Sequence, residues 1–352
     1  MSAADAPRDA EWFAHRYVED RDAILFRHTT RDEHRDAIFA TDEYLSDDAK
    51  LIEIDRRQAL ATAAPAGSVH FIFHSAFCCS TLLARAFDRE GLAMGLKEPP
   101  ILNDLVGWRR RGAAGRDVAE AMDGALALLA RPFGPLEATV IKPSNAVNGL
   151  ARMMMALRPD ARAVLLHAPL PVFLTSVAKK GLDGRLWVRE LFFGQRTDGL
   201  VQLLGFSDEQ FFGQTDLQIA AAGWLAQQAL FADLVAQLGD RVRTLDSETL
   251  LDRPEESVAA LAQLYGLDVS DDEVRDIVAG SFGRNSKSGE AFGRAEREAE
   301  YAEAGTAHRD ELDKVAAWAE TVAQTVGIPL VLDAPLLGPV GRERRAEIAA
   351  AP

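Results

Sequence analysis

Small and hydroxyl-bearing residues stand between an apolar run and a helical pattern early in the chain. Ser80 and Thr81 follow the apolar run 69–73 and a short loop, and residues 82–87 then carry apolar side chains at helical spacing. A loop that leads from a buried strand into a helix presents backbone N–H groups and the positive end of the helix dipole, which bind phosphate or sulfate. The two hydroxyls could add hydrogen bonds to such an anion, or they could simply cap the helix.

This loop differs from the loop of ordinary ATP- and GTP-hydrolysing proteins. The pattern G-x-x-x-x-G-K-S/T is absent, because the loop contains neither glycine nor lysine. Cys78 and Cys79, the only two cysteines, lie inside it. A thiol at a helix N-terminus could be reactive, but no C-x-x-C spacing accompanies the pair, and small residues suit the approach of backbone to an anion. Adjacent cysteines cannot form a structural disulfide framework, which suits a reducing cytoplasm.

The segments around this loop alternate between predicted strands and helices, including a long helix over 216–238. Strands separated by helices indicate an α/β fold with a mostly parallel sheet flanked by helices on both faces. Ligands of such sheets bind beyond the carboxyl ends of the strands, where the loop lies. The predicted strands are 69–73, 139–142, 163–167, 242–245 and 328–332.

The length and composition of the chain limit its possible domain organisation. Its 352 residues, 48% hydrophobic and 26% charged, are typical of a soluble globular protein. We expect a mainly helical addition over residues 1–66, an α/β domain over 67–335 and a flexible tail over 336–352. The charged N-terminus has no apolar signal core, and no run approaches the roughly 18 apolar residues needed to span a bilayer. These features predict a cytoplasmic protein without a membrane partner.

The net charge of −15 and the isoelectric point of about 5.0 argue against a groove for DNA or RNA, since such grooves need clustered basic residues. They leave room for one local basic pocket that binds a small anion.

The segment FIFHSAFCCSTLLARAF (71–87) resembles the 5′-phosphosulfate loop of sulfotransferases, which runs from a strand through Pro-Lys/Arg-Ser-Gly-Thr/Ser-Thr-Leu/Trp into a helix. The resemblance implies a P-loop NTPase-like fold with helical additions. It also implies transfer of a sulfonyl group from 3′-phosphoadenosine 5′-phosphosulfate (PAPS) to an acceptor, without a metal. The residues that match the loop, and would bind the donor, are Cys78, Cys79, Ser80, Thr81 and Leu82.

Phe77 stands where the family usually has a basic residue that contacts the phosphosulfate. Another cation must then take this role if the protein is an active transferase. Lys97, in GLKEPP, and Lys142, at the end of the strand 139–142, are the expected substitutes.

The resemblance predicts a second anion site after the strand 163–167, where the family holds the donor's 3′-phosphate with Arg-x-Pro-x-Asp-x-x-x-Ser. His167 stands at the Arg place and Pro171 at the Asp place of this motif. A His at a strand end is commonly a core residue, and it is a weaker phosphate clamp than Arg. The hydroxyls that match, and the basic residues that could complete this site, are Thr175, Ser176, Lys179, Lys180, Arg185, Arg189, Arg284 and Lys287.

A general base must take the proton of the acceptor, and relatives use His or Glu. Glu98 is the first candidate, since it lies close in sequence to the loop, and His74 at the mouth of the loop is the second. Glu98 could instead pair with Lys97 or cap a helix, and His74 could be a hydrogen-bonded strand-end residue.

The segment 241–268 adds a further match in the expected order, with Glu248 and Pro254 at the family's acidic and proline positions. Two other functions stay open. A P-loop kinase would need a loop lysine and a Mg²⁺ ligand, and a non-catalytic nucleotide-binding protein would fit the departures at Phe77 and His167. The acceptor, a small molecule or peptide, and the oligomeric state cannot be derived from the sequence.

Overall fold

The computed structural model describes residues 5–282 and 294–338. Its centre is a five-stranded sheet in which every pair of neighbouring strands is parallel. The strand order is β5-β6-β4-β7-β8, so β4 and the loop that follows it occupy the middle. The strands are β4 (Val69–His74), β5 (Ala93–Lys97), β6 (Ala138–Lys142), β7 (Ala163–His167) and β8 (Val242–Asp246).

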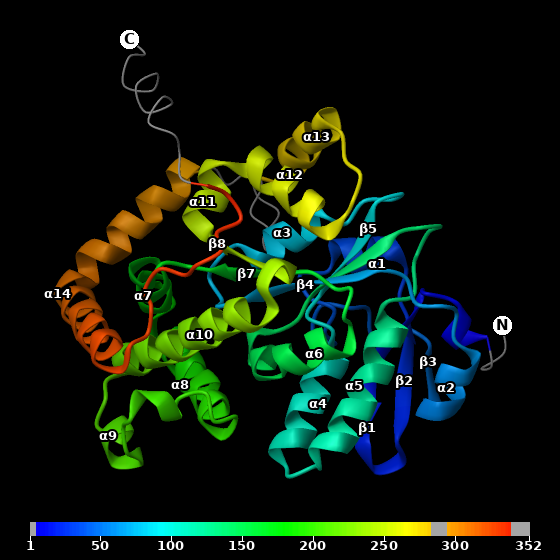
Figure 1. The fold of residues 1–352 in the computed structure, drawn as a ribbon, viewed down its shortest axis with the longest axis horizontal. Helices are drawn as coiled ribbons and strands as arrows, with labels where there is room; N and C mark the ends of the chain where they lie inside the picture. The colour runs from blue at the N-terminus through cyan, green and yellow to red at the C-terminus, as the bar shows by residue number, and fades with distance from the viewer. Residues whose placement is uncertain (1–4, 283–293, 339–352) are drawn as a thin grey trace.

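Both faces of this sheet are covered by helices, as the sequence predicts (Figure 1). Along β4, Phe71 and Phe73 belong to one apolar cluster and Ile72 to another, because successive side chains of a strand point to opposite faces. The first cluster includes residues of α4 (Pro100–Arg110), α5 (Gly115–Leu129) and α6 (Ala151–Leu157). The second includes residues of α3 (Ser80–Ala86), α7 (Leu170–Lys179), α8 (Gly181–Thr197), α12 (Pro254–Tyr265) and α14 (Arg294–Val326). The α/β class and the parallel sheet are thus confirmed.

The predicted long helix is α10 (Asp216–Leu238), which begins with a capping box between Thr215 and Gln218. Among the described residues it is the one helix that is long and apolar enough, by length and composition, to cross a membrane. The expectation that no apolar run approaches the length needed to span a bilayer is therefore wrong for this helix. The apolar window is 72% buried inside the fold, so α10 packs as a core helix between the two apolar clusters.

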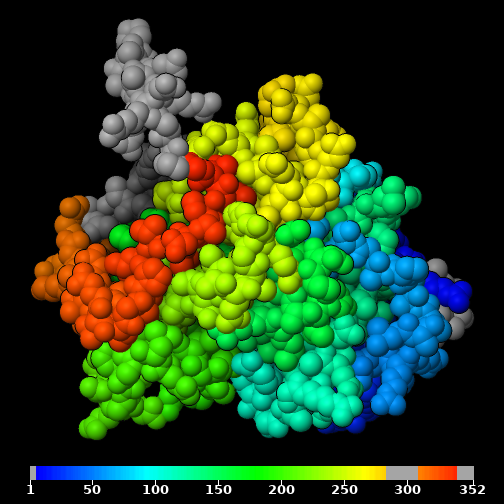
Figure 2. Space-filling model, in the orientation of Figure 1, coloured from blue at the N-terminus to red at the C-terminus, as the bar shows by residue number. Residues whose placement is uncertain are grey.

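The N-terminal segment is not the mainly helical addition that the sequence predicts. It forms an antiparallel sheet of β1 (Trp12–Val18), β2 (Ala23–His28) and β3 (Leu51–Asp55). Phe13 and Phe26 lie in the same apolar cluster as Phe71 of β4, so the segment contributes to the main core. Figure 2 shows its blue surface continuous with the cyan and green surface of the α/β domain.

Arg131 fastens this N-terminal segment to the end of α5. Its guanidinium is buried and donates hydrogen bonds to the carbonyl oxygens of Leu128, Ala6, Asp9 and Trp12 at 2.6–3.1 Å. Burial lowers the pKa of Arg131 to about 10, and the four carbonyls compensate part of the lost hydration.

The carboxyl-terminal part departs from the sequence prediction at one element. Residues 328–332 do not form the expected strand; the chain instead makes an isolated bridge between Thr244 and Pro335. The predicted tail 336–352 lies outside the described residues from 339 onward. The remaining helices are α1 (Arg31–Asp36), α2 (Arg56–Thr62), α9 (Asp208–Phe212), α11 (Ser247–Asp252) and α13 (Asp271–Ser281), with short 3₁₀ turns η1 (Ala6–Arg8), η2 (Glu19–Arg21), η3 (Asn145–Leu150), η4 (Gln202–Leu204) and η5 (Gly239–Arg241).

Candidate functional site

The carboxyl ends of β5, β6 and β4, which are neighbours in the sheet, open into one cavity of about 670 Å³. This is where ligands of parallel sheets bind. The predicted site residues that line it are His74, Phe77, Cys78, Cys79, Ser80, Thr81, Glu98, Lys142 and Lys180. The structure therefore brings together the candidate base, one of the two candidate cations and most of the loop.

The loop after β4 has an unusual backbone. Ala76, Phe77 and Cys79 have φ values of 73°, 52° and 64°, a left-handed region that non-glycine residues rarely adopt. Such strain persists only where the surrounding structure enforces it, and it clusters at functional sites. Mixed right- and left-handed turns form concave arrays of backbone N–H groups that bind anions. Ser80 and Thr81, both buried, follow at the start of α3 and line the same cavity.

Two anchors hold the loop in this conformation. The Ser75 N–H donates to the Leu166 carbonyl oxygen at 3.0 Å, and its hydroxyl accepts from the Ala168 N–H at 3.1 Å. On the other side, the Nδ1 atom of His74 accepts from the Ala76 N–H at 3.1 Å, and its Nε2 lies 3.0 Å from the Pro143 carbonyl oxygen. The loop is thus tied to both strands that flank β4.

These contacts determine the protonation state of His74. A carbonyl oxygen can only accept, so Nε2 carries the proton, and Nδ1 must be unprotonated to accept from Ala76. His74 is therefore neutral, and no lone pair remains to take a proton from an acceptor. In this arrangement His74 holds the loop against the turn after β6, and its role as second-choice general base stays a prediction.

Glu98 and Lys142 form an ion pair at the cavity wall. The Glu98 N–H also donates to the Lys142 carbonyl oxygen at 2.7 Å, and Lys142 Nζ lies 4.9 Å from the centroid of the Phe39 ring. Side-chain exposure is 2% for Lys142 and 19% for Glu98. Glu98 is another non-glycine residue with positive φ, 56°. A carboxylate that can accept a proton and an ammonium that can stabilise negative charge therefore share one wall.

Phe77 is not basic, but a lysine lies beside it at the same end of the cavity. Its ring packs against Trp187 and Phe173 at centroid distances of 5.3 and 5.7 Å. The Lys180 Nζ atom lies 6.0 Å from the centroid of the Phe77 ring, and Lys180 lines the cavity. Lys142 and Lys180 are thus the cavity cations that could replace the basic residue missing from the loop.

Lys97, the other expected substitute, is not brought to the cavity. Its Nζ atom donates to the carbonyl oxygens of Arg35 and Ala37 at 3.0 and 2.6 Å, and it is 2% exposed. Burial lowers the pKa of Lys97 to about 7. Lys97 therefore anchors the N-terminal segment to β5 and does not pair with Glu98.

The cysteines of the loop differ in their surroundings. Burial raises the pKa of Cys78 to about 12, with a smaller effect from Cys79, so Cys78 stays a thiol and a poor nucleophile. Cys79 is half-buried and precedes α3. Leu82 is buried on α3 and packs without lining the cavity.

Of the residues predicted for the second anion site, Lys180 lines this cavity, and His167, Thr175, Ser176, Arg185 and Arg189 do not. His167 is buried, its Nδ1 donates weakly to the Leu165 carbonyl oxygen at 3.5 Å, and burial lowers its pKa. Thr175 and Ser176 donate to carbonyl oxygens one turn earlier in α7, each at 2.8 Å. Arg185 pairs with Glu311, and Arg189 with Asp216. Arg284 and Lys287 lie outside the described residues.

Several lining residues were missed by the sequence analysis. Ser144 and Asn145 directly follow the strand that ends at Lys142, so position alone could have indicated them. Phe39 and Tyr44 come from the N-terminal segment, in which no motif indicates the residues that reach the cavity. The missed lining residues are Phe39, Glu43, Tyr44, Ala76, Ser144, Asn145, Asp183, Gly184 and Trp187.

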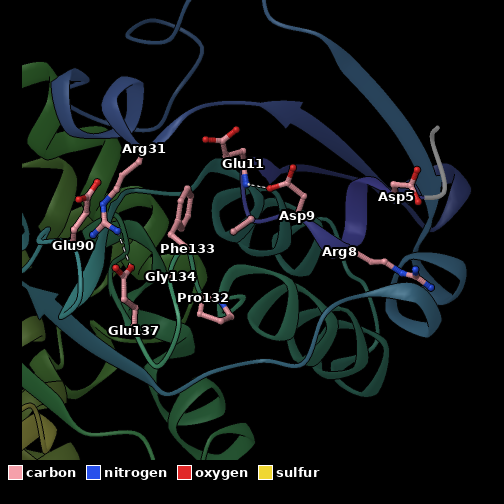
Figure 3. Close-up of a pocket in the computed structure, with 11 residues that line it drawn as sticks. Asp5, Arg8, Asp9, Glu11, Arg31, Glu90, Pro132, Phe133, Gly134 and Glu137 are labelled. Atoms are coloured by element: carbon pink, nitrogen blue, oxygen red, sulfur yellow. Dashed lines mark hydrogen bonds and ion pairs between the residues drawn. The ribbon is translucent and has the colours of Figure 1, made fainter. Parts of the chain in front are cut away.

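A second, more open hollow lies beside the N-terminal segment (Figure 3). Arg31 pairs there with Glu137 at 2.7 Å, and Glu137 also accepts from the Gly91 N–H at 2.6 Å. These contacts fasten α1 to the loop before β6, so they indicate a structural role.

Comparison with known proteins gives matches among solved structures. No protein-family model matches the sequence, and no curated protein matches it. The chain is similar to the sulfotransferase domain from the curacin biosynthetic pathway, with 15% identity and a TM-score of 0.39 over 64% of this chain and 80% of that one. It is also similar to a sulfotransferase of Mycobacterium tuberculosis, with 16% identity and a TM-score of 0.38 over 63% and 75%. Both are sulfotransferases.

Proposed function

We propose that this protein transfers a sulfonyl group from PAPS to a hydroxyl-bearing acceptor. The observation that carries the proposal is the strained loop over 75–79, followed by the hydroxyls of Ser80 and Thr81, at one cavity with Glu98 and Lys142. The loop can bind the 5′-phosphosulfate through backbone N–H groups and hydroxyls. The residues of the loop also resemble the corresponding segment of sulfotransferases.

The reaction needs little covalent participation by the protein. The bond between sulfur and the bridging oxygen of the 5′-phosphate breaks while a bond forms between sulfur and the acceptor oxygen. Glu98 takes the acceptor's proton, and 3′-phosphoadenosine 5′-phosphate (PAP) leaves. Lys142 and Lys180 stabilise the negative charge on the sulfonyl and leaving oxygens, in the way that lysines stabilise transferring phosphoryl groups.

A non-catalytic nucleotide-binding protein on the same fold is the second candidate. Two observations favour it: Phe77 replaces the usual basic residue, and His167 is buried with a lowered pKa, so it is a poor clamp for a 3′-phosphate. Such a protein would bind the donor and leave it unchanged.

Turnover of PAPS separates these functions. The purified protein is mixed with PAPS and with pools of phenols, alcohols, sugars or amino alcohols. We expect PAP to form faster in this mixture than in a solution of PAPS without the protein, as measured by ion-exchange chromatography. Release of PAP should not need Mg²⁺. Donor binding without release in any pool would favour the non-catalytic candidate, and Mg²⁺-dependent consumption of ATP would contradict the proposal in favour of a kinase.

A further inference from the structure

Asn145 carries a buried hydrogen-bond donor that lacks a partner within the described part of the chain. The side-chain nitrogen Nδ2 is inaccessible to solvent and makes no hydrogen bond, and the residue is 8% exposed. Buried polar groups are nearly always paired, because an unpaired donor loses its hydration without compensation. Since Asn145 lines the cavity, its unpaired donor points to a bound group that supplies the acceptor.

Asn145 lies close in the fold to the reacting part of the site. It follows Lys142 by three residues, in the turn that leaves β6, and β6 lies between the strands that carry Glu98 and the loop. The turn is fixed by the contact between His74 and the Pro143 carbonyl oxygen at 3.0 Å. Asn145 therefore begins the turn η3 that follows β6, the strand between β5, which leads to the candidate base, and β4, which leads to the anion-binding loop.

We propose, building on the proposed function, that Asn145 Nδ2 donates a hydrogen bond to an oxygen of the sulfonyl group of bound PAPS. The sulfonyl group has three non-bridging oxygens that share its negative charge and need donors. Lys142 is paired with Glu98, so part of its positive charge is already offset. A neutral amide adds a fixed donor at this wall without adding charge, which is how positioned amides stabilise developing negative charge.

The test compares PAPS with PAP, which lacks the sulfonyl group, by isothermal titration calorimetry without acceptor. We expect Asn145→Ala to weaken PAPS binding about tenfold or more and to leave PAP binding unchanged, since hydrogen bonds to charged groups are among the stronger ones. Asn145→Asp, which keeps the size of the side chain, should weaken PAPS further through charge repulsion. Asn103→Ala, on an exposed position of α4, should change neither affinity.

Three results would overturn the inference. Equal weakening of PAPS and PAP would indicate that Asn145 only supports the fold of the turn. Unchanged PAPS affinity in both Asn145 variants would mean that Nδ2 meets another group, such as an oxygen of the acceptor. Failure of the unsubstituted protein to bind either ligand would overturn the proposed function together with this inference, whereas the first two results leave the proposed function standing. Melting temperatures of the unliganded variants show which of them are folded.

Discussion

Replacement of Glu98 by glutamine is expected to lower the rate of PAPS turnover by about 10²–10⁴-fold, the usual contribution of a positioned general base. Glutamine keeps the size of the side chain and can still accept a hydrogen bond from Lys142, but it cannot take the acceptor's proton. The affinity for PAP should stay within about threefold of that of the unsubstituted protein, because the bisphosphate contacts the loop. Steady-state kinetics with the best acceptor pool, together with calorimetric titration of PAP, measure both quantities.

The ion pair with Lys142 makes a control necessary. Removing one partner leaves the other as a buried, uncompensated charge, which commonly costs about 3–5 kcal/mol, and Lys142 is 2% exposed. The double variant Glu98→Gln/Lys142→Met removes both charges and should recover most of the stability lost in Glu98→Gln. Its turnover should stay low, because it lacks both the proposed base and one of the two proposed cations. If the double variant recovered turnover as well, Glu98 would serve the fold and another group would be the base.

The stability of the protein is expected to rise with pH between about 7 and 10 because of Lys97. Its pKa falls from 10.5 to about 7 in the folded protein, chiefly because of burial; the charges of Arg85 and Lys142 add to the shift, and Asp88 and Asp36 oppose it. In this interval the unfolded chain binds a proton that the folded chain does not, so the free energy of unfolding rises with pH. The contribution is complete above about 10.5, decreases steadily as the pH falls from 10.5 to about 7, and is absent below about 7.

The structure explains why the neutral form of Lys97 is favoured. A neutral amine has two N–H groups, and the two carbonyl oxygens of Arg35 and Ala37 accept both. One pKa unit corresponds to about 1.4 kcal/mol, so the expected change over the whole interval is a few kcal/mol.

Urea unfolding of the protein and of Lys97→Met at pH 6, 7.5 and 9 measures this effect. The stability advantage of lysine over methionine should be smallest at pH 6 and largest at pH 9. Lys314→Met is the matched control, since Lys314 is 73% exposed in its pair with Asp310 and should give the same difference at every pH. If the difference in the free energy of unfolding between the unsubstituted protein and Lys97→Met does not vary with pH, Lys97 stays protonated in the folded protein.

The strands of the central sheet were largely predictable because both of their faces are buried. Such strands appear as continuous apolar runs, and the predictions for β4, β6, β7 and β8 agree with the structure to within one residue. β5 was missed because Gly95 interrupts its pattern. A Cβ atom at Gly95 would lie 2.3 Å from the Ala84 carbonyl oxygen, so glycine is required where α3 crosses the strand.

The antiparallel sheet at the N-terminus could not be derived from composition. Its strands contain charged residues, such as Glu53 in β3, and their pairing depends on contacts between distant segments. Burial of Phe13 and Phe26 against the main core provides these contacts, and tertiary packing of this kind overrides local preference.

The candidate site was predicted in part. Lys142 and Glu98 end adjacent strands, and the carboxyl ends of parallel strands meet at one edge. Lys97 was expected at the same site, and the register of β5 and β6 does place it opposite Lys142, but its amine is held by two carbonyl oxygens of the N-terminal segment. Glu98 reaches Lys142 because the chain leaves the strand at Glu98 with a φ of 56°, which a single sequence does not reveal.

The most direct test of the central claim, that the loop over 75–81 binds the phosphosulfate end of PAPS, is a thermal-shift titration with PAP against ATP and Mg²⁺. The account predicts that the melting temperature rises with PAP concentration, following RT ln(1 + [L]/Kd), which gives about 2.7 kcal/mol at one hundred times Kd. ATP with Mg²⁺ should give a smaller shift. No shift with PAP, or a shift only with ATP and Mg²⁺, would contradict the claim.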